Sequence, residues 1–69
     1  MELRKEDVEF AELLYCAIEG DARSQFLLGE RYYKGDGVLK NRRMAIAWYS
    51  LAAALGNEMA DAKLKEIAG

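Results

Sequence analysis

The chain has 69 residues, of which 52% are apolar, and it carries a net charge of −2, one cysteine and no histidine. This length allows one small domain, which buries only about 60% of the surface that its unfolded chain exposes. A single cysteine excludes an internal disulfide, and the lack of histidine excludes His-based catalysis and the commonest metal ligand. Because neither a disulfide nor a bound metal is expected to stabilise this small core, the high apolar content favours association with another chain.

Helices are expected throughout, because proline is absent and Gly, Asp and Asn interrupt the apolar repeats at regular points. The first helix should span about residues 7–19. It carries one apolar stripe at steps of three and four, formed by Val8, Ala11, Leu14, Tyr15 and Ile18. Cys16 in this segment is interpreted as a small buried apolar side chain. Gly20 suits the position just after the helix, and Asp21 suits the N-cap of the next one.

Three further helices are expected over residues 22–34, 42–55 and 58–68. Asn41 and Asn57 suit the N-caps of the last two, and Gly56 stops the third. The Gly-Asp-Gly segment 35–37 ends the second helix, and Val38 is expected to turn back into the core. The two-residue junctions leave no room for a linker, so consecutive helices must fold back on each other as an all-α chain of about four helices.

The block between residues 27 and 56 holds glycines and apolar residues at fixed spacings. They are Leu28, Gly29, Tyr32, Gly35, Gly37, Val38, Ala45, Trp48, Tyr49, Ala52, Ala53 and Gly56. This layout resembles the Sel1-like repeat, a relative of the tetratricopeptide repeat. The resemblance implies a solenoid of antiparallel helical hairpins that binds proteins and has no chemistry of its own. Gly29 should let the third helix approach the second closely, and Tyr32, Trp48 and Tyr49 should fill the space where the two helices splay apart.

A shift of 36 residues aligns the chain with itself, close to the 34-residue period of the tetratricopeptide unit. It superposes Gly20 on Gly56, Ala11 on Ala47, Ala17 on Ala53, Leu28 on Leu64 and Glu30 on Glu66. We interpret the chain as a single Sel1-like domain in which residues 1–21 are a capping helix left from a truncated repeat. Residues 22–57 form the complete repeat and residues 58–69 a terminal capping helix. The family usually has glycine where this chain has Lys65, which suggests that the array ends there.

The expected third helix is apolar nearly all the way round, and such a helix must be buried on more than one side. Met44, Leu51 and Leu55 fall within about 40° of one another on it. Either the first helix covers this strip, or the strip serves self-association or a partner. Because the family usually has lysine at positions 44 and 51, we predict an exposed strip and a homodimer.

Phe26 and Tyr33 are seven residues apart, on the face of the second helix away from Leu28 and Tyr32. In the family that the chain resembles, first helices line a concave surface that binds ligands. The two rings are therefore predicted as partner contacts, and packing against the first helix is the alternative.

Charge is unevenly distributed along the chain. Residues 1–21 hold seven acids and two bases, whereas residues 31–43 hold five bases and one acid. Arg42 and Arg43 stand in the first turn of the expected third helix, where the helix dipole disfavours cations, and they are predicted as partner contacts. The basic segment is a solvated loop, a surface that pairs with acids on another chain, or a nucleic-acid patch, which the acidic chain as a whole disfavours.

No enzyme, cofactor or metal site is expected, since the segment 34–37 lacks the ending of a phosphate-binding P-loop and the spaced acids of a calcium loop. No apolar run has the length of a signal peptide or a membrane span, so a cytoplasmic protein is expected. The sequence predicts a protein-binding module without a small-molecule substrate: a stand-alone bacterial or phage-encoded regulator that blocks a target. The alternatives are an adaptor in a larger complex and, less favoured, a nucleic-acid binder that uses residues 31–43.

Overall fold

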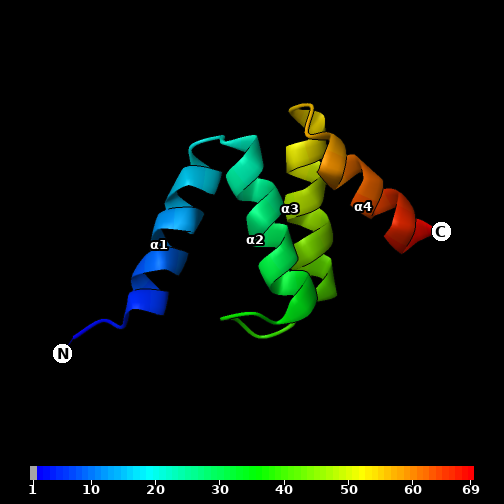
Figure 1. Cartoon of the computed structure of the whole chain (residues 1–69). Helices are drawn as coiled ribbons and strands as arrows, with labels where there is room; N and C mark the ends of the chain where they lie inside the picture. Colours follow the sequence, from blue (N-terminus) through cyan, green and yellow to red (C-terminus); the bar gives the residue numbers. More distant parts are fainter. Residues whose placement is uncertain (1) are drawn as a thin grey trace.

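The computed structural model describes residues 2–69, and this part of the chain is all-helical. Its elements are α1 (Lys5–Ile18), α2 (Ala22–Lys34), α3 (Arg42–Ala54) and α4 (Glu58–Ala68). Figure 1 shows them side by side in one row, each running opposite to the one before it. Each helix packs against its neighbours in the chain, and the contact between α2 and α3 is the most extensive. The predicted all-α architecture of antiparallel hairpins is confirmed.

Two junctions, between α1 and α2 and between α3 and α4, are built in the same way. Gly20 and Gly56 have φ angles of 100° and 95°, which cost a glycine little and other residues much. The amides of Asp21 and Asn57 each donate to the carbonyl five residues earlier, at 3.1 and 3.0 Å. This pattern satisfies helix carbonyls that would otherwise lack a partner. The local structure therefore repeats after 36 residues, as the internal alignment predicts.

The predicted N-caps are confirmed. The side chains of Asp21, Asn41 and Asn57 accept hydrogen bonds from the amides three residues later, at 3.3, 3.0 and 2.9 Å. The start of α1 has no such signal, since Arg4 occupies the N-cap without a side-chain hydrogen bond. This helix therefore begins two residues before the expected position, at Lys5. Both α1 and α3 end one residue early, at Ile18 and Ala54, because the residue before each glycine already forms the cap.

The core is thin and consists mainly of alanine. Its buried apolar residues are Ala17, Leu28, Ala45, Tyr49, Ala52 and Ala60. A Cβ at Gly29 would lie 2.7 Å from Cδ1 of Tyr49 and 3.3 Å from the carbonyl oxygen of Ala45, so α2 and α3 do approach closely there. The ring of Tyr49 lies against Gly29. Trp48 is half-buried, and its part in filling the space between the helices stays a prediction. Val38 is half-buried and lies outside the central cluster.

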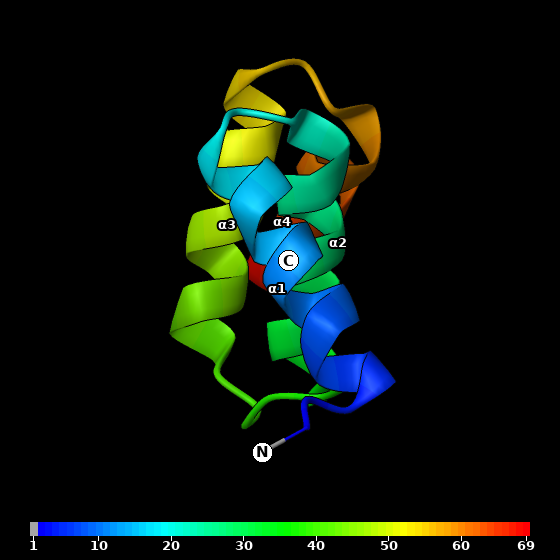
Figure 2. The same cartoon turned by 90° about the vertical axis from the view of Figure 1, so that its left-hand side faces the viewer.

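The first helix is joined to the rest of the fold by a limited contact. Ala17 is its one buried residue, whereas Val8, Tyr15 and Ile18 are 39%, 65% and 65% exposed. Cys16 is also exposed, so its interpretation as a buried side chain is wrong. Figure 2 shows that α1 is inclined relative to α2 and α3, and its extensive contact is with α2. Most of its apolar stripe is therefore left uncovered within the described residues.

Candidate interaction surfaces

The first surface is the apolar strip of α3. Met44, Leu51 and Leu55 are 37%, 51% and 57% exposed. The other side of the same helix supplies Ala45 and Tyr49 to the core. The alternative that α1 covers the strip completely is wrong, because the three side chains stay 37–57% exposed. The residues are brought together on one side of α3, as predicted, and that side is open.

The second candidate, the aromatic pair, lies elsewhere than expected. Phe26 and Tyr33 are both half-buried, and their ring centroids lie 5.7 and 6.3 Å from that of Tyr49. The ammonium group of Lys63 lies 5.7 Å from the Tyr33 centroid, within the range of a cation–π contact. The two rings therefore pack mainly against α3. They are neither fully exposed, as partner contacts would be, nor packed mainly against the first helix. Phe26 keeps one side toward the groove between α1 and α2.

A carboxylate that the sequence did not single out links three helices. The Tyr49 hydroxyl donates to Oε1 of Glu30 at 2.5 Å, and ammonium groups of Lys34 and Lys63 lie 3.0 and 3.8 Å from the same carboxylate. Burial raises the pKa of Glu30, but the hydrogen bonds from Tyr49 and Lys34 and the nearby positive charges outweigh it and lower that pKa overall. Burial and the bond to Glu30 raise the pKa of Tyr49. The match of Glu30 with Glu66 after 36 residues was the available sequence signal.

The basic segment 31–43 is divided between internal contacts and solvent. Lys34 pairs with Glu30, and Arg42 donates to the carbonyl of Ile67 at 3.4 Å. That carbonyl belongs to the C-terminal end of α4, where the helix dipole favours a cation, so Arg42 has a use within the fold. Arg43 and Lys40 are exposed. The segment therefore presents fewer charges to a partner than its composition indicates.

A groove between α1 and α2 is the third surface, and no pattern in the sequence indicates it. Its volume is about 560 Å³. Two acids of α1, Glu9 and Glu12, line one wall. The other wall carries both signs, because Glu30 and Asp36 lie there with Arg31 and Lys34. Apolar groups from both helices lie between these walls, contributed by Leu13, Cys16, Phe26 and Leu27. The groove is thus apolar along its middle, acidic along α1 and of mixed charge along α2.

Residues 2–69 contain no cluster of three or more Cys, Asp or Glu side chains arranged to hold a metal ion. Among the helices of the same residues, none combines the length and apolar character needed to cross a bilayer.

The fold and the glycine positions agree with comparisons to known proteins. The Sel1 repeat family matches residues 22–57, more than half of the chain, and the chain belongs to this family of protein-interaction repeats. The DAP3-binding cell death enhancer 1 of Rattus norvegicus is 43% identical over 52 residues, or 75% of this chain. Its namesake in Mus musculus is 42% identical over 55 residues, or 80% of this chain. The matches span only 10% and 11% of those two proteins. No solved structure matches the chain.

Proposed function

We propose that this chain is a non-catalytic protein-binding module and that the α3 strip, Met44, Leu51 and Leu55, is its main contact surface. The proposal rests on one observation: these side chains remain 37–57% exposed on a helix whose other side already packs into the core. Grouped exposed apolar side chains mark interaction sites. The rodent relatives support protein binding in general, since their name describes binding to DAP3.

Two versions of this function remain proposals. In the first, the module is a small bacterial or phage-encoded cytoplasmic regulator that blocks the working surface of one target. In the second, it is an adaptor within a larger assembly. The relatives favour the second version, because the similar segment is about a tenth of a longer protein in both rodents, and nothing about them supports a bacterial or phage source.

Partner capture from the native cell, read by mass spectrometry, tests the function. The double variant Leu51→Lys with Leu55→Lys should lose a specific protein partner that the natural chain retains. Leu39→Lys is the matched control, since Leu39 is 91% exposed and lies in the loop before α3. Recovery of nucleic acid in place of a protein would support the nucleic-acid alternative instead. Retention of the same partner by the double variant would place the contact surface elsewhere.

The predicted homodimer would form through the α3 strip. A standard interface buries about 800 Å² per partner. The molecule measures 43 × 23 × 14 Å, so only a broad 43 × 23 Å side offers such an area. Sedimentation equilibrium at micromolar concentration should show a dimer, and Leu51→Lys should weaken it about tenfold or more by placing a charge in an apolar contact. A monomer of 7.8 kDa at all concentrations would contradict the prediction.

The exposed bases predict a kinetic effect on a partner. Arg43→Glu should slow association and flatten its dependence on salt, because exposed charges at the rim of an interface steer the encounter more than they hold the complex. Arg42→Glu should also destabilise the fold slightly, because it removes the bond to the Ile67 carbonyl. Surface plasmon resonance with the captured partner at two salt concentrations measures both variants. Equal association rates for Arg43→Glu and the natural chain would exclude the basic segment from the interface.

A further inference from the structure

The apolar strip of α3 has a counterpart on α1. The 36-residue shift that aligns the chain with itself superposes Val8 on Met44 and Tyr15 on Leu51. The members of each pair are exposed to similar degrees, 39% and 37% for the first pair and 65% and 51% for the second. Each helix also has an exposed alanine between these two residues. The α1 seam is therefore Val8, Ala11 and Tyr15, and the matching α3 seam is Met44, Ala47 and Leu51.

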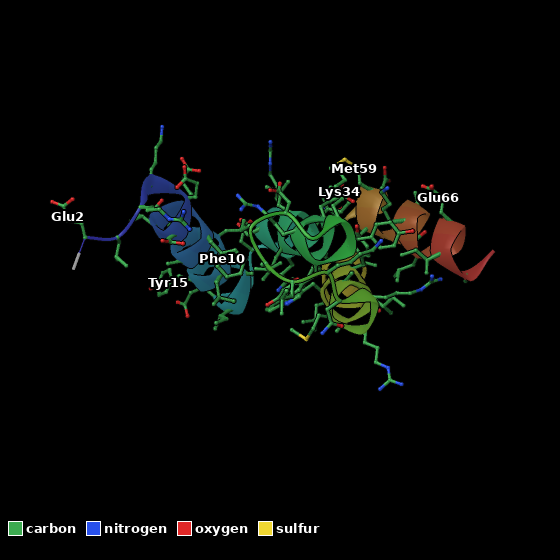
Figure 3. The ribbon with its side chains drawn as sticks, turned by 90° about the horizontal axis from the view of Figure 1, so that it is seen from below. Glu2, Phe10, Tyr15, Lys34, Met59 and Glu66 are labelled. Carbon is green, nitrogen blue, oxygen red and sulfur yellow. The ribbon has the colours of Figure 1, made fainter. Side chains whose placement is uncertain are left out.

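Both seams lie on one side of the molecule. Figure 3 shows Tyr15 and the ribbon of α3 on the side of the row opposite to Lys34, Met59 and Glu66. The other side of α3 carries Tyr49 into the core between α2 and α4, so the α3 seam points away from those helices. An apolar hollow of about 500 Å³ accompanies the α1 seam and can receive side chains of another helix. It is lined by Leu3, Val8, Ala11, Glu12, Tyr15 and Cys16.

The α3 seam alone is too small for a stable contact between two copies. A helix of 13 residues is about 20 Å long and about 10 Å wide, whereas a standard interface buries about 800 Å² per partner. With α1 included, the apolar face extends over two helices of a broad 43 × 23 Å side, which offers such an area. A dimer built on the α3 strip therefore needs the α1 seam as well.

Charges beside the seams indicate which helix lies on which. In a parallel pair of helices, the residue just before the first seam position faces the residue just after the second one. Arg43 precedes Met44 and Glu12 follows Ala11, so a pairing of α3 with α1 brings opposite charges together. Within residues 2–69, neither of these two side chains has an ion-pair partner. Each is thus free to pair with the other across a contact between copies.

The remaining charges of the two helices do not oppose this pairing. Asp7, which precedes the α1 seam, already pairs with Arg4 at 3.5 Å and would face the uncharged Trp48. Glu19, one turn beyond Tyr15, would face a serine, Ser50. The other nearby bases are Lys5, which pairs with Glu9, Arg42, which donates to the carbonyl of Ile67, and Lys40, which lies in the loop before α3.

Other pairings between copies lack this match. A pairing of α1 with α1 would set two acidic helices against each other, since residues 1–21 hold seven acids and two bases. A pairing of α3 with α3 would leave Arg43 of each copy without an acid. Figure 1 shows that α1 and α3 run in the same direction in the row. A two-fold axis parallel to them therefore brings α1 of each copy onto α3 of the other.

We propose that two copies join face to face, with the α1 seam of each copy on the α3 seam of the other and Glu12 beside Arg43. This dimer rests on the proposed use of the α3 strip and adds the surface that covers it. The contact is isologous, so it closes at a dimer and forms both ion pairs at once.

Sedimentation equilibrium on the full chain tests the proposal by charge exchange. Glu12→Arg alone and Arg43→Glu alone should each weaken the dimer about tenfold or more, because each places like charges in both halves of the contact. In a mixture of the two variants, mixed dimers should form about as tightly as natural dimers, since each Arg then meets a Glu. The double variant Glu12→Arg with Arg43→Glu should also dimerise normally. Both positions are exposed, and an acid suits the first turn of α3, so the variants should stay folded.

Matched controls separate this contact from general effects of charge. Glu6→Arg and Arg23→Glu make the same charge changes at exposed positions away from the seams and should leave the dimer unchanged. Tyr15→Lys should weaken the dimer about as strongly as Leu51→Lys. Met59→Lys places the same charge on an exposed apolar residue of the opposite side and should have no such effect.

Three outcomes would overturn the proposal. One is a dimer that Leu51→Lys abolishes but that Tyr15→Lys and Glu12→Arg leave intact, which would keep the α3 strip as the contact surface and exclude α1. Another is a loss of dimer in the single charge variants without recovery in their mixture, which would show that Glu12 and Arg43 do not face each other. The third is a chain that stays monomeric at all concentrations. Partner capture with the strip variants would then still decide the proposed function separately.

Discussion

Replacing Gly29 by leucine should unfold most of the protein. Even a Cβ at this position would lie 2.7 and 2.8 Å from two ring carbons of Tyr49, closer than such atoms approach in folded proteins. Tyr49 cannot move away easily, because it is fully buried and its hydroxyl is bonded to Glu30. We expect a loss of roughly 2–4 kcal/mol in the free energy of unfolding, from overpacking and from separation of α2 and α3. A core this small supplies only about 3–5 kcal/mol in total.

Thermal melting followed by circular dichroism measures this loss. Arg23→Leu is the matched control, because it adds the same side chain at an exposed position of the same helix and should change the melting temperature little. Leucine is also a better helix former than glycine, so helix propensity alone would raise stability at position 29 by a few tenths of a kcal/mol or more. A melting temperature of Gly29→Leu equal to that of the natural chain would refute the close approach of the two helices.

Local signals account for what the sequence predicted well. The start of each of the last three helices is marked by an Asp or Asn cap, and these positions were predicted to the residue. Gly20 and Gly56 have positive φ angles, so the chain must leave the helix there whatever surrounds it. The bounds of α1 were less accurate, since Arg4 offers no capping side chain. Signals of this kind act within a few residues and need no knowledge of the rest of the fold.

It was harder to predict which side of each helix faces which neighbour, because this depends on packing between helices. Phe26 and Tyr33 lie on the face away from Leu28, but the large ring of Tyr49 extends far enough to meet both. Cys16 belongs to an apolar helix, but only a small part of the α1 surface packs against α2, and this thiol stays exposed. Periodicity identifies an apolar face without saying which neighbour covers it or whether any neighbour does.

The candidate surfaces show the same difference between features of one helix and features that depend on packing between helices. The strip of Met44, Leu51 and Leu55 was predicted because the three residues share one face of a single helix. The α1–α2 groove was missed because its walls belong to two helices, and only the 36-residue alignment connects Glu9 and Leu13 with their counterparts on α3.

Removal of the Tyr49 hydroxyl should have the second largest effect on stability. In Tyr49→Phe the ring still fills the core, but the 2.5 Å bond to the Glu30 carboxylate is lost. Hydrogen bonds to charged groups contribute about 1.5–3 kcal/mol, and the Glu30 side chain is only 18% exposed, so solvent replaces the bond poorly. Urea denaturation near neutral pH should show a loss of this size. Tyr33→Phe removes a hydroxyl from a neighbouring ring and should cost much less.

The pH dependence separates this bond from a general loss of packing. Because the fold lowers the pKa of Glu30 below its ordinary value of 4.5, the carboxylate stabilises the natural chain above pH 4.5, and this contribution is lost as the pH falls through the lowered value. Because the fold raises the pKa of Tyr49 above 10.0, its contribution is complete below pH 10.0 and is lost as the pH rises beyond it. Tyr49→Phe should therefore flatten the acid side of the stability profile and remove the Tyr49 contribution on the alkaline side. A profile parallel to that of Tyr33→Phe over the whole range would show that the hydroxyl and the carboxylate are not coupled.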